Sequence, residues 1–211
     1  MNPGTNQGCW DADYRHKGKM YGGSPRRIPP FPDGARVLEL GCGDGKTLSA
    51  LVRRGWDITA IDFSPIAISL AQAPARHGAG VTLVVADARD IPFCDRTFDA
   101  VVAVHLLGHS MAGDRMQIAR EIHRVMRPGG QLYFCDFSLR DFRYGTGREA
   151  EPGTFVRGTG IMTHYFSRDE LTGLFSGLVP ESFQQEEWML RVRGSDHLRS
   201  EITMTFRRNE L

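Results

Sequence analysis

The chain contains 211 residues, 41% of them hydrophobic, which allows one sizeable core but is too short for two full domains. Its 26 lysines and arginines nearly balance 25 acidic residues, so the overall charge gives no case for nucleic acid, although a local basic face stays open. Cys9, Cys42, Cys94 and Cys135 are scattered, without the spacing of a zinc site, and favour free thiols. The sequence has neither a signal-peptide core nor an apolar run long enough to span a membrane, so we expect a cytoplasmic protein that binds no metal.

The first 34 residues are rich in glycine, proline and asparagine, with aromatic and basic residues between them. Prolines at 25, 29, 30 and 32 exclude a long helix at the end of this segment and predict an extended approach to the first strand. Its tyrosines Tyr14 and Tyr21 either cover a neighbouring site or simply anchor the segment. We therefore expect an N-terminal arm or lid at 1–34 and a domain at 35–211.

A glycine-rich turn follows the first predicted strand. The strand-like run 36–40 leads into Gly41, Gly43 and Gly45, and a helix is predicted directly after them. Such a turn lets a ligand approach the backbone and offers it the free N–H groups of a helix start, which is typical of a nucleotide-cofactor site. Glu39 precedes the turn, and a carboxylate there suits a cationic amino group, or a water network that needs an acceptor, better than the pyrophosphate of NAD. The third glycine also stands one position too early for the dinucleotide pattern.

The second predicted strand, 56–63, closes on the acid Asp62. Ser64-Pro65 then starts a helix, because serine is a good N-cap and proline suits the first helical position. Asp62 therefore lies at the carboxyl end of its strand, where doubly wound domains hold a ribose diol. The alternative is that Asp62 simply caps the helix that follows.

Two more strands follow, at 81–86 and 98–104. The first leads into the pattern D-A-x-x-I-P-F, which begins at Asp87, and the second begins with F-D-x-V. Together with E-x-G-x-G-x-G at 39–45, these patterns resemble the class I S-adenosylmethionine-dependent methyltransferases, type 11 subgroup. The resemblance covers roughly 36–206 and implies S-adenosylmethionine as cofactor and S-adenosylhomocysteine as product.

The resemblance also implies which residues bind the cofactor. An acid and three glycines line the methionine end, a second acid holds the ribose, an aromatic ring packs on the adenine, and a third acid with its neighbour binds the adenine edge. Two further residues complete the expected site. In this order the residues are Glu39, Gly41, Gly43, Gly45, Asp62, Phe63, Asp87, Ala88, Val104 and Tyr21.

Two histidines, His105 and His109, follow the fourth strand in the sequence V-H-L-L-G-H. From this position the fold reaches the methyl group and its acceptor, and imidazole titrates near working pH, so both are candidates to take a proton from the nucleophile. Alternatively they shape the pocket, because methyl transfer from a sulfonium often needs little besides an aligned approach. The absence of an N-P-P-Y type motif here argues against exocyclic amino groups of DNA bases or protein glutamine as acceptors.

The rest of the chain continues the alternation of helix and strand. A helix at 114–127 and a strand at 131–137 extend a parallel sheet with helices on both faces. A capping box at 167–170 starts another helix, and alternating runs at 188–192 and 202–206 predict a hairpin. We therefore expect an α/β, Rossmann-like fold with a seven-stranded, mostly parallel sheet and an antiparallel C-terminal hairpin, as the resemblance also implies.

Residues 138–166 interrupt this alternation with a segment dense in glycine and arginine. A loop of this length tends to be a lid or a binding element. In the methyltransferases that this chain resembles, the corresponding segment covers the acceptor. Its arginines either read an anionic or aromatic substrate or are simply solvated. The substrate candidates are Arg143, Tyr144 and His164, with Arg140, Arg157 and Tyr165 beside them, and Tyr14 from the arm.

The function expected from these residues is direct methyl transfer to a small, possibly anionic acceptor by a monomer or homodimer. The first alternative is a tRNA methyltransferase of the wobble-uridine type, which requires the arginines of arm, insert and hairpin to share one face. A non-catalytic cofactor-binding subunit that activates a partner is an alternative of another class. An NAD-dependent oxidoreductase is disfavoured by the glycine spacing.

Overall fold

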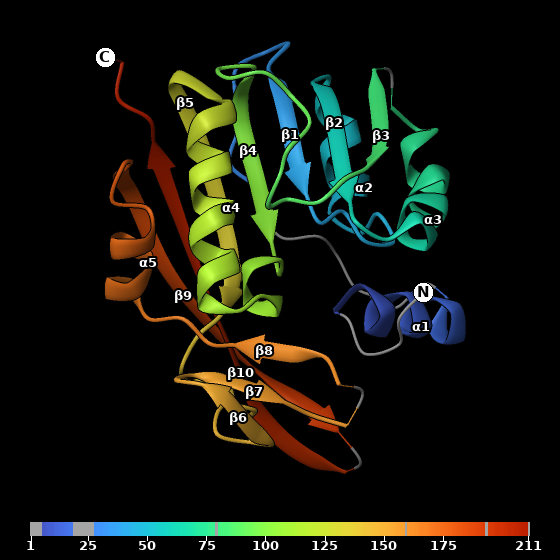
Figure 1. The fold of residues 1–211 in the computed structure, drawn as a ribbon, viewed down its shortest axis with the longest axis vertical. Coiled ribbons are helices and arrows are strands. Elements are labelled where there is room, and N and C mark those ends of the chain that lie inside the picture. Colours follow the sequence, from blue (N-terminus) through green and yellow to red (C-terminus); the bar gives the residue numbers. More distant parts are fainter. Residues whose placement is uncertain (1–5, 19–27, 79, 159, 193, 211) are drawn as a thin grey trace.

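The computed structural model describes residues 6–18, 28–78, 80–158, 160–192 and 194–210, and its main feature is a seven-stranded sheet (Figure 1). The strands are β1 (Arg36–Leu40), β2 (Asp57–Asp62), β3 (Val81–Val85), β4 (Phe98–Val104), β5 (Met126–Phe137), β9 (Val179–Val192) and β10 (Ser195–Arg207). Their order across the sheet is β3-β2-β1-β4-β5-β10-β9. Strands β1 to β5 are parallel to one another, and β10 is antiparallel to β5 and β9. The predicted parallel sheet with a C-terminal hairpin is therefore confirmed.

Helices cover both faces of this sheet. They are α2 (Leu48–Leu51), the 3-10 turns η1 (Val52–Arg54) and η2 (Leu107–His109), α3 (Pro65–Ala75), α4 (Ala112–Val125) and α5 (Arg168–Leu174). Leu48 and Ile68 pack with alternate residues of β1, β2 and β4 on one face. Ile122 and Leu171 pack with the intervening residues of the same strands on the other face. Each of the strands β1, β2 and β4 thus buries apolar residues on both faces.

The carboxyl ends of the parallel strands point to one edge, and two smaller elements lie beside that edge (Figure 1). One is the helix α1 (Asn6–Lys17). The other is a three-stranded antiparallel sheet of β6 (Arg148–Glu151), β7 (Thr154–Val156) and β8 (Met162–His164). The carboxyl ends of the parallel strands are therefore covered from two directions, and in open α/β sheets ligands bind at these ends.

The structure differs from the sequence-based predictions in three places. A helix forms at Asn6–Lys17, where the sequence predicted only an arm. The insert 138–166 contains the β6–β8 sheet, where a long loop was predicted. The helix after the glycine turn is one α-turn followed by η1, because Gly55 adopts a left-handed φ of 72° and ends it. The division into an arm at 1–34 and a domain at 35–211 stays a prediction.

Candidate cofactor and acceptor site

The glycine turn after β1 has the backbone that its sequence demands. Gly41, Gly43 and Gly45 adopt φ values of 66°, 54° and 85°, a region that favours glycine. A side chain at Gly43 would meet the Tyr14 hydroxyl at 2.8 Å. A side chain at Gly41 would meet Leu106 at the same distance. The turn is therefore closely covered by α1 and by the segment after β4.

Glu39 lies within the sheet, paired with Ala60 on one side and Val102 on the other, and is only 2% exposed. The Leu48 backbone N–H donates to its carboxyl group, but its Oε2 atom is buried and has no partner among the residues that the structure describes. Burial raises the pKa of Glu39 well above its ordinary value, and the nearby Asp62 raises it further. A buried acceptor without a donor fits a ligand that brings a cationic N–H group.

Asp62 ends β2 and holds the glycine turn to the start of α3. Its Oδ2 accepts from the Gly43 N–H at 2.9 Å, and its Oδ1 accepts from the Ser64 N–H at 2.9 Å. Burial raises the pKa of Asp62 to about 6, although these two backbone hydrogen bonds favour the charged form. Each carboxylate oxygen keeps a second lone pair, so the group can also accept from the hydroxyls of a ribose.

The three positions expected around an adenine lie at the ends of β2 and β3. Phe63 packs against Trp10 and Tyr14 of α1, and Ala88 is buried. The Asp87 carboxylate is held by the Arg89 guanidinium, with 2.6 Å between Oδ2 and Nη2. Burial would raise the pKa of Asp87, but Arg89 lowers it below its ordinary value. Asp87 is therefore an ionised acceptor with part of its capacity already used.

Helix α1 joins two of the loops that carry predicted site residues. Gln7 donates to the Phe63 carbonyl at 2.9 Å, and Asn6 donates to the His109 carbonyl at 2.8 Å. The Ser64 hydroxyl donates to the buried Asp11. Tyr14, expected beside the substrate, therefore lies at the glycine turn of the cofactor end. Tyr21 is outside the described residues.

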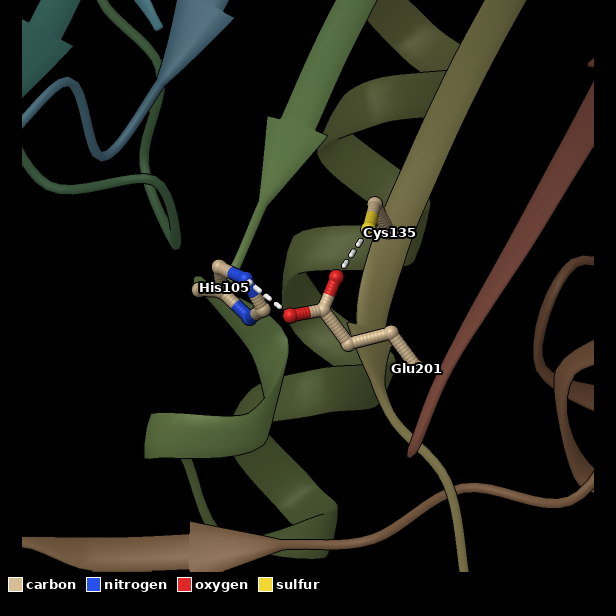
Figure 2. A group of neighbouring side chains, drawn as sticks. All are labelled: His105, Cys135 and Glu201. Atoms are coloured by element: carbon tan, nitrogen blue, oxygen red, sulfur yellow. Dashed lines mark hydrogen bonds and ion pairs between the residues drawn. The ribbon is translucent and has the colours of Figure 1, made fainter. Parts of the chain in front are cut away.

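His105 lies between two carboxylates, as Figure 2 shows for one of them. Its Nε2 is 3.3 Å from Glu201 Oε1, and its Nδ1 is 3.5 Å from Asp136 Oδ1. Burial would lower the pKa of His105, but the hydrogen bonds to Asp136 and Glu201 raise it to about 9. The ring is therefore an imidazolium at neutral pH, which donates protons and does not accept one.

The backbone of His105 is also unusual. Its φ is 51°, a value that a residue with a side chain rarely adopts, and its N–H donates to the Cys135 carbonyl at 2.8 Å. Asp136 fixes the next turn by accepting from the Gly108 N–H at 2.9 Å, and a side chain at Gly108 would strike that carboxylate. The loop after β4 is thus held in one shape by β5.

Metal donors are also grouped here. His105, Cys135 and Glu201 place donor atoms within 4.8 Å of one another, and this is the one such group among the described residues (Figure 2). Cys135 Sγ is 3.4 Å from Glu201 Oε2. Glu201 already accepts a hydrogen bond from Cys135 and forms an ion pair with His105. The positive charge near the Glu201 carboxylate is therefore supplied by His105 and not by a metal ion.

His109 differs from His105 in its protonation. Its Nδ1 is 2.7 Å from the Met162 carbonyl of β8, and Trp10 contacts the ring edge-on at 4.9 Å between centroids. Burial lowers the pKa of His109, so the ring is neutral and Nδ1 carries the proton that Met162 accepts. Its Nε2 then holds a lone pair to which no described residue donates.

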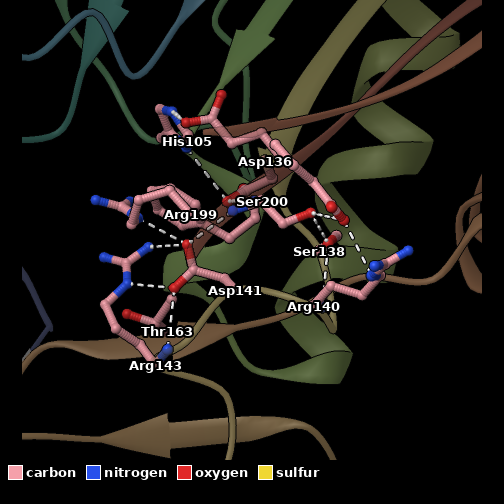
Figure 3. Close-up of polar contacts among 12 residues, drawn as sticks. His105, Asp136, Ser138, Arg140, Asp141, Arg143, Thr163, Arg199 and Ser200 are labelled. Carbon is pink, nitrogen blue, oxygen red and sulfur yellow. Dashed lines mark hydrogen bonds and ion pairs between the residues drawn. The ribbon is translucent and has the colours of Figure 1, made fainter. Parts of the chain in front are cut away.

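A cationic and aromatic cluster continues from His105 toward the insert, and Figure 3 shows its polar contacts. His105 stacks on the Phe137 ring at 4.4 Å, and the guanidinium carbons of Arg143 and Arg199 lie 3.9 Å and 4.7 Å from the same ring. Asp141 lies between the two arginines and accepts from both at 2.7 Å. Of these residues the sequence indicated only His105 and Arg143.

The other two insert candidates have different surroundings. His164 is buried, with Nε2 2.7 Å from Glu170 and Nδ1 2.7 Å from Thr154, so it joins β7 and β8 to α5. Glu170, the last residue of the capping box, therefore directs its side chain to His164. Tyr144 is 44% exposed and contacts Tyr165 edge-on at 5.7 Å. Val104, the last residue of β4, precedes His105 and is half-buried.

Comparison with known proteins agrees with this geometry. Residues 37–130 match the family model described as a methyltransferase domain. The tRNA N(3)-cytidine methyltransferase METTL2 of Danio rerio is 30% identical over 162 residues, which are 71% of this chain and 46% of that protein. The demethylmenaquinone methyltransferase of Corynebacterium kroppenstedtii is 37% identical over 113 residues, which are 54% of this chain and 46% of that protein. The chain thus spans less than half the length of these two relatives.

A solved structure extends the similarity beyond the matched family region. A SAM-dependent methyltransferase from Methanosarcina mazei superposes with a TM-score of 0.73 at 25% identity, covering 85% of this chain and 94% of the other. In the described part of this chain, no helix is both long and apolar enough to cross a membrane.

Proposed function

The chain belongs to the class I S-adenosylmethionine-dependent methyltransferases, and we propose that it transfers a methyl group from S-adenosylmethionine to a small-molecule acceptor. When bound, this cofactor supplies a methyl group on a positively charged sulfonium, which already activates the leaving group. The protein then has to bind both molecules, align the nucleophile with the methyl group and accept a proton where the nucleophile carries one.

The cofactor residues support the first of these tasks. The Oε2 atom of Glu39, which has no partner among the described residues, is an acceptor for the amino group of the methionine moiety. Asp62 is an acceptor for the ribose hydroxyls, and the glycine turn lets the ligand approach the backbone between them. We also propose that the adenine and the methyl group are surrounded by Phe63, Asp87, Ala88 and Val104.

A single observation supports a small acceptor over a large one. His109 is held from two sides, since Asn6 of α1 donates to its carbonyl and its ring contacts the Met162 carbonyl of β8. These contacts join α1 and the β6–β8 sheet directly over the loop that follows β4. A folded macromolecule would have to break them to reach that loop, whereas a small molecule would not.

The two histidines then have different proposed roles. His109 Nε2 is the proton acceptor for the nucleophile, because the ring is neutral and its Nδ1–H is already donated. His105 keeps its proton between Asp136 and Glu201 and is a positioning residue, which holds Phe137 by stacking and presents a fixed positive charge.

One experiment tests this proposal. Purified protein with labelled S-adenosylmethionine is offered either a metabolite extract freed of macromolecules or total tRNA, and methylated products are identified by mass spectrometry. We expect label in a small molecule and none in tRNA. Calorimetric titration with S-adenosylhomocysteine serves as the control, because binding without turnover on either pool would favour the cofactor-binding subunit.

Transfer to tRNA is the second candidate, and the similarity to the tRNA N(3)-cytidine methyltransferase METTL2 favours it. It predicts an affinity for tRNA that falls steeply with salt, because each phosphate contact releases counterions. Among the described arginines, Arg140, Arg143 and Arg199 do gather beside the edge of the sheet, but each is paired with a carboxylate of this chain. Label in tRNA alone would replace the small-molecule proposal with this one.

A further inference from the structure

The cluster around Asp141 has more hydrogen-bond donors than acceptors. Asp141 is 2% exposed, and its two oxygens already accept from Arg143, Arg199 and the backbone N–H groups of Arg143 and Ser200. The arginines lower the pKa of Asp141 below its ordinary value, although burial opposes this. The carboxylate is therefore ionised and has little acceptor capacity left.

Two groups beside it, Arg157 and Tyr165, have donor capacity that no carboxylate of the described residues takes up. Arg157 donates to the Thr163 hydroxyl at 3.4 Å, and among the described residues no carboxylate forms an ion pair with it. Tyr165 is completely buried, and its hydroxyl has no hydrogen-bond partner in the described part of the chain. Leaving a buried hydroxyl unsatisfied is costly, so such an atom requires an explanation.

The charges around the Tyr165 hydroxyl also indicate a missing anion, because positive groups outnumber negative ones. The Tyr165 hydroxyl lies within electrostatic reach of three guanidinium groups, those of Arg143, Arg157 and Arg199, and of one carboxylate, Asp141. Burial lowers the pKa of Arg157, and its cationic neighbours Arg143 and Arg199 lower it further. An anion would compensate this excess of positive charge and supply the missing acceptors.

We propose that Arg157, Arg143, Arg199 and Tyr165 form a subsite for an oxyanion, a carboxylate or phosphate group, of the methyl acceptor. This subsite is close to His105, because Arg143 and Arg199 lie against one aromatic ring, Phe137, on which His105 also stacks. Figure 3 shows His105, Arg143 and Arg199 in one region of the molecule. Arg143 also lies within electrostatic reach of His109. The anionic group would therefore be held close to the atom that is methylated.

This inference rests on the proposed function for the identity of the ligand but not for the existence of the subsite. The planar guanidinium binds carboxylate and phosphate oxygens in pairs, so an oxyanion is the ligand class that the donors select. The Tyr165 hydroxyl is sealed by the side chains around it, so we expect them to move when the anion enters.

The test uses the full chain, with inorganic phosphate and acetate as probes in calorimetric and thermal-shift titrations, each with and without saturating S-adenosylhomocysteine. Arg157→Gln removes the charge but keeps hydrogen-bond donors, and Tyr165→Phe removes only the hydroxyl. Arg191→Gln is the matched control, because this arginine is 70% exposed on the distal hairpin and pairs with Asp196. We expect saturable anion binding that weakens about tenfold or more in Arg157→Gln and is unchanged in Arg191→Gln.

Tyr165→Phe separates a binding role from a structural one. We expect this variant to bind the anion more weakly while its thermal midpoint without anion is unchanged or higher, because it lacks the unsatisfied hydroxyl. A lower midpoint with unchanged anion affinity would overturn the assignment of Tyr165. Anion binding that does not saturate, or that is equal in Arg157→Gln and Arg191→Gln, would overturn the subsite.

The control with S-adenosylhomocysteine keeps the two proposals apart. If it binds normally and anion binding does not depend on Arg157, only the subsite is wrong. If it does not bind while the anion does, the proposed methyl transfer fails and the subsite stands. Binding of a short single-stranded RNA that depends on Arg157, without binding of either free anion, would overturn the small-molecule form of the inference.

Discussion

The Glu201 carboxylate of β10 reaches the imidazole of His105 after β4, with 3.3 Å between Oε1 and Nε2. The two residues are 96 positions apart in the sequence, and β5 lies between their strands in the sheet. Asp136 of β5 approaches the other ring nitrogen, so the ring is charged by residues from two neighbouring strands. These two carboxylates raise the pKa of His105, which its position in the sequence alone does not indicate.

The charge of His105 predicts how stability depends on pH. The pKa of His105 is about 9 in the folded protein and 6.5 as its ordinary value, so the folded state binds more protons between these values. Its contribution to stability is therefore complete below pH 6.5 and is lost as the pH rises through 9. We expect the free energy of unfolding in urea, wild type minus His105→Asn, to be constant below this window and to fall across it. Asparagine is chosen because it tolerates the left-handed backbone. Parallel pH profiles of the two proteins would contradict the prediction.

The neutral state of His109 predicts a selective loss of turnover. His109→Gln should lower kcat by about 10²-fold, the lower end of what general base catalysis contributes. The affinity for S-adenosylhomocysteine should stay unchanged, since the described partners of the ring, Met162 and Trp10, are not among the expected cofactor residues. Stopped assays and calorimetry measure the two quantities, and His105→Asn is the comparison variant. Loss of cofactor binding in His109→Gln would place this histidine in the cofactor site.

Asp62 is expected to bind the ribose and also holds the protein's own turn. Asp62→Ala removes both roles, whereas Asp62→Asn keeps an acceptor for the Gly43 or Ser64 N–H. We expect Asp62→Ala to weaken cofactor binding by about 1.5–3 kcal/mol, the usual value of hydrogen bonds to a charged group, and to lower the thermal midpoint. Asp62→Asn should lose cofactor affinity with a smaller loss of stability. If cofactor affinity is unchanged in both variants, Asp62 does not bind the ribose.

The positions of two expected cofactor residues, Glu39 and Asp62, were predictable because each has a local signal in the sequence. Glu39 and Asp62 stand at or near the ends of parallel strands, and such ends meet at one edge of the sheet. The predicted strand limits therefore sufficed to bring these two acids together. Their buried state and raised pKa values follow from the packing and required the structure.

The acceptor end was not predictable in the same way. Arg199 and Glu201 reach the site only because β10 pairs with β5 in the register that places Glu201 opposite Phe137. A shift of one residue would turn both side chains to the other face, and no local pattern fixes that register. Helix α1 was missed because its sequence contains glycine and polar residues on most sides. It is held by tertiary contacts, such as those of Trp10 and Tyr14 with Ala67 of α3.

Chelation of metal ions should leave the protein unchanged. The donor atoms of His105, Cys135 and Glu201 are close enough for a metal, but the proton on His105 already neutralises the charge there. We expect dialysis against a chelator to alter neither the thermal midpoint nor the affinity for S-adenosylhomocysteine. A midpoint that falls and is restored by Zn²⁺ in the wild type, but not in Cys135→Ser, would show instead that these residues form a metal site.

Glu39 predicts opposite effects on the free and the ligand-bound protein. Its pKa in the folded protein lies well above the ordinary value of 4.5, so the folded state holds this proton more tightly than the unfolded state does. The contribution of Glu39 to the free energy of unfolding therefore falls as the pH rises above 4.5. Glu39→Gln cannot ionise, and we expect it to be more stable than the wild type at neutral pH in urea unfolding, with a difference that shrinks toward pH 4.5. Its affinity for S-adenosylhomocysteine should fall about tenfold or more, because a carboxylate that accepts from the ligand's amino group is replaced by a neutral amide. Saturating ligand should therefore remove or reverse the stability advantage of the variant. A variant that is less stable at every pH, yet binds the ligand as the wild type does, would show that Glu39 supports the fold alone.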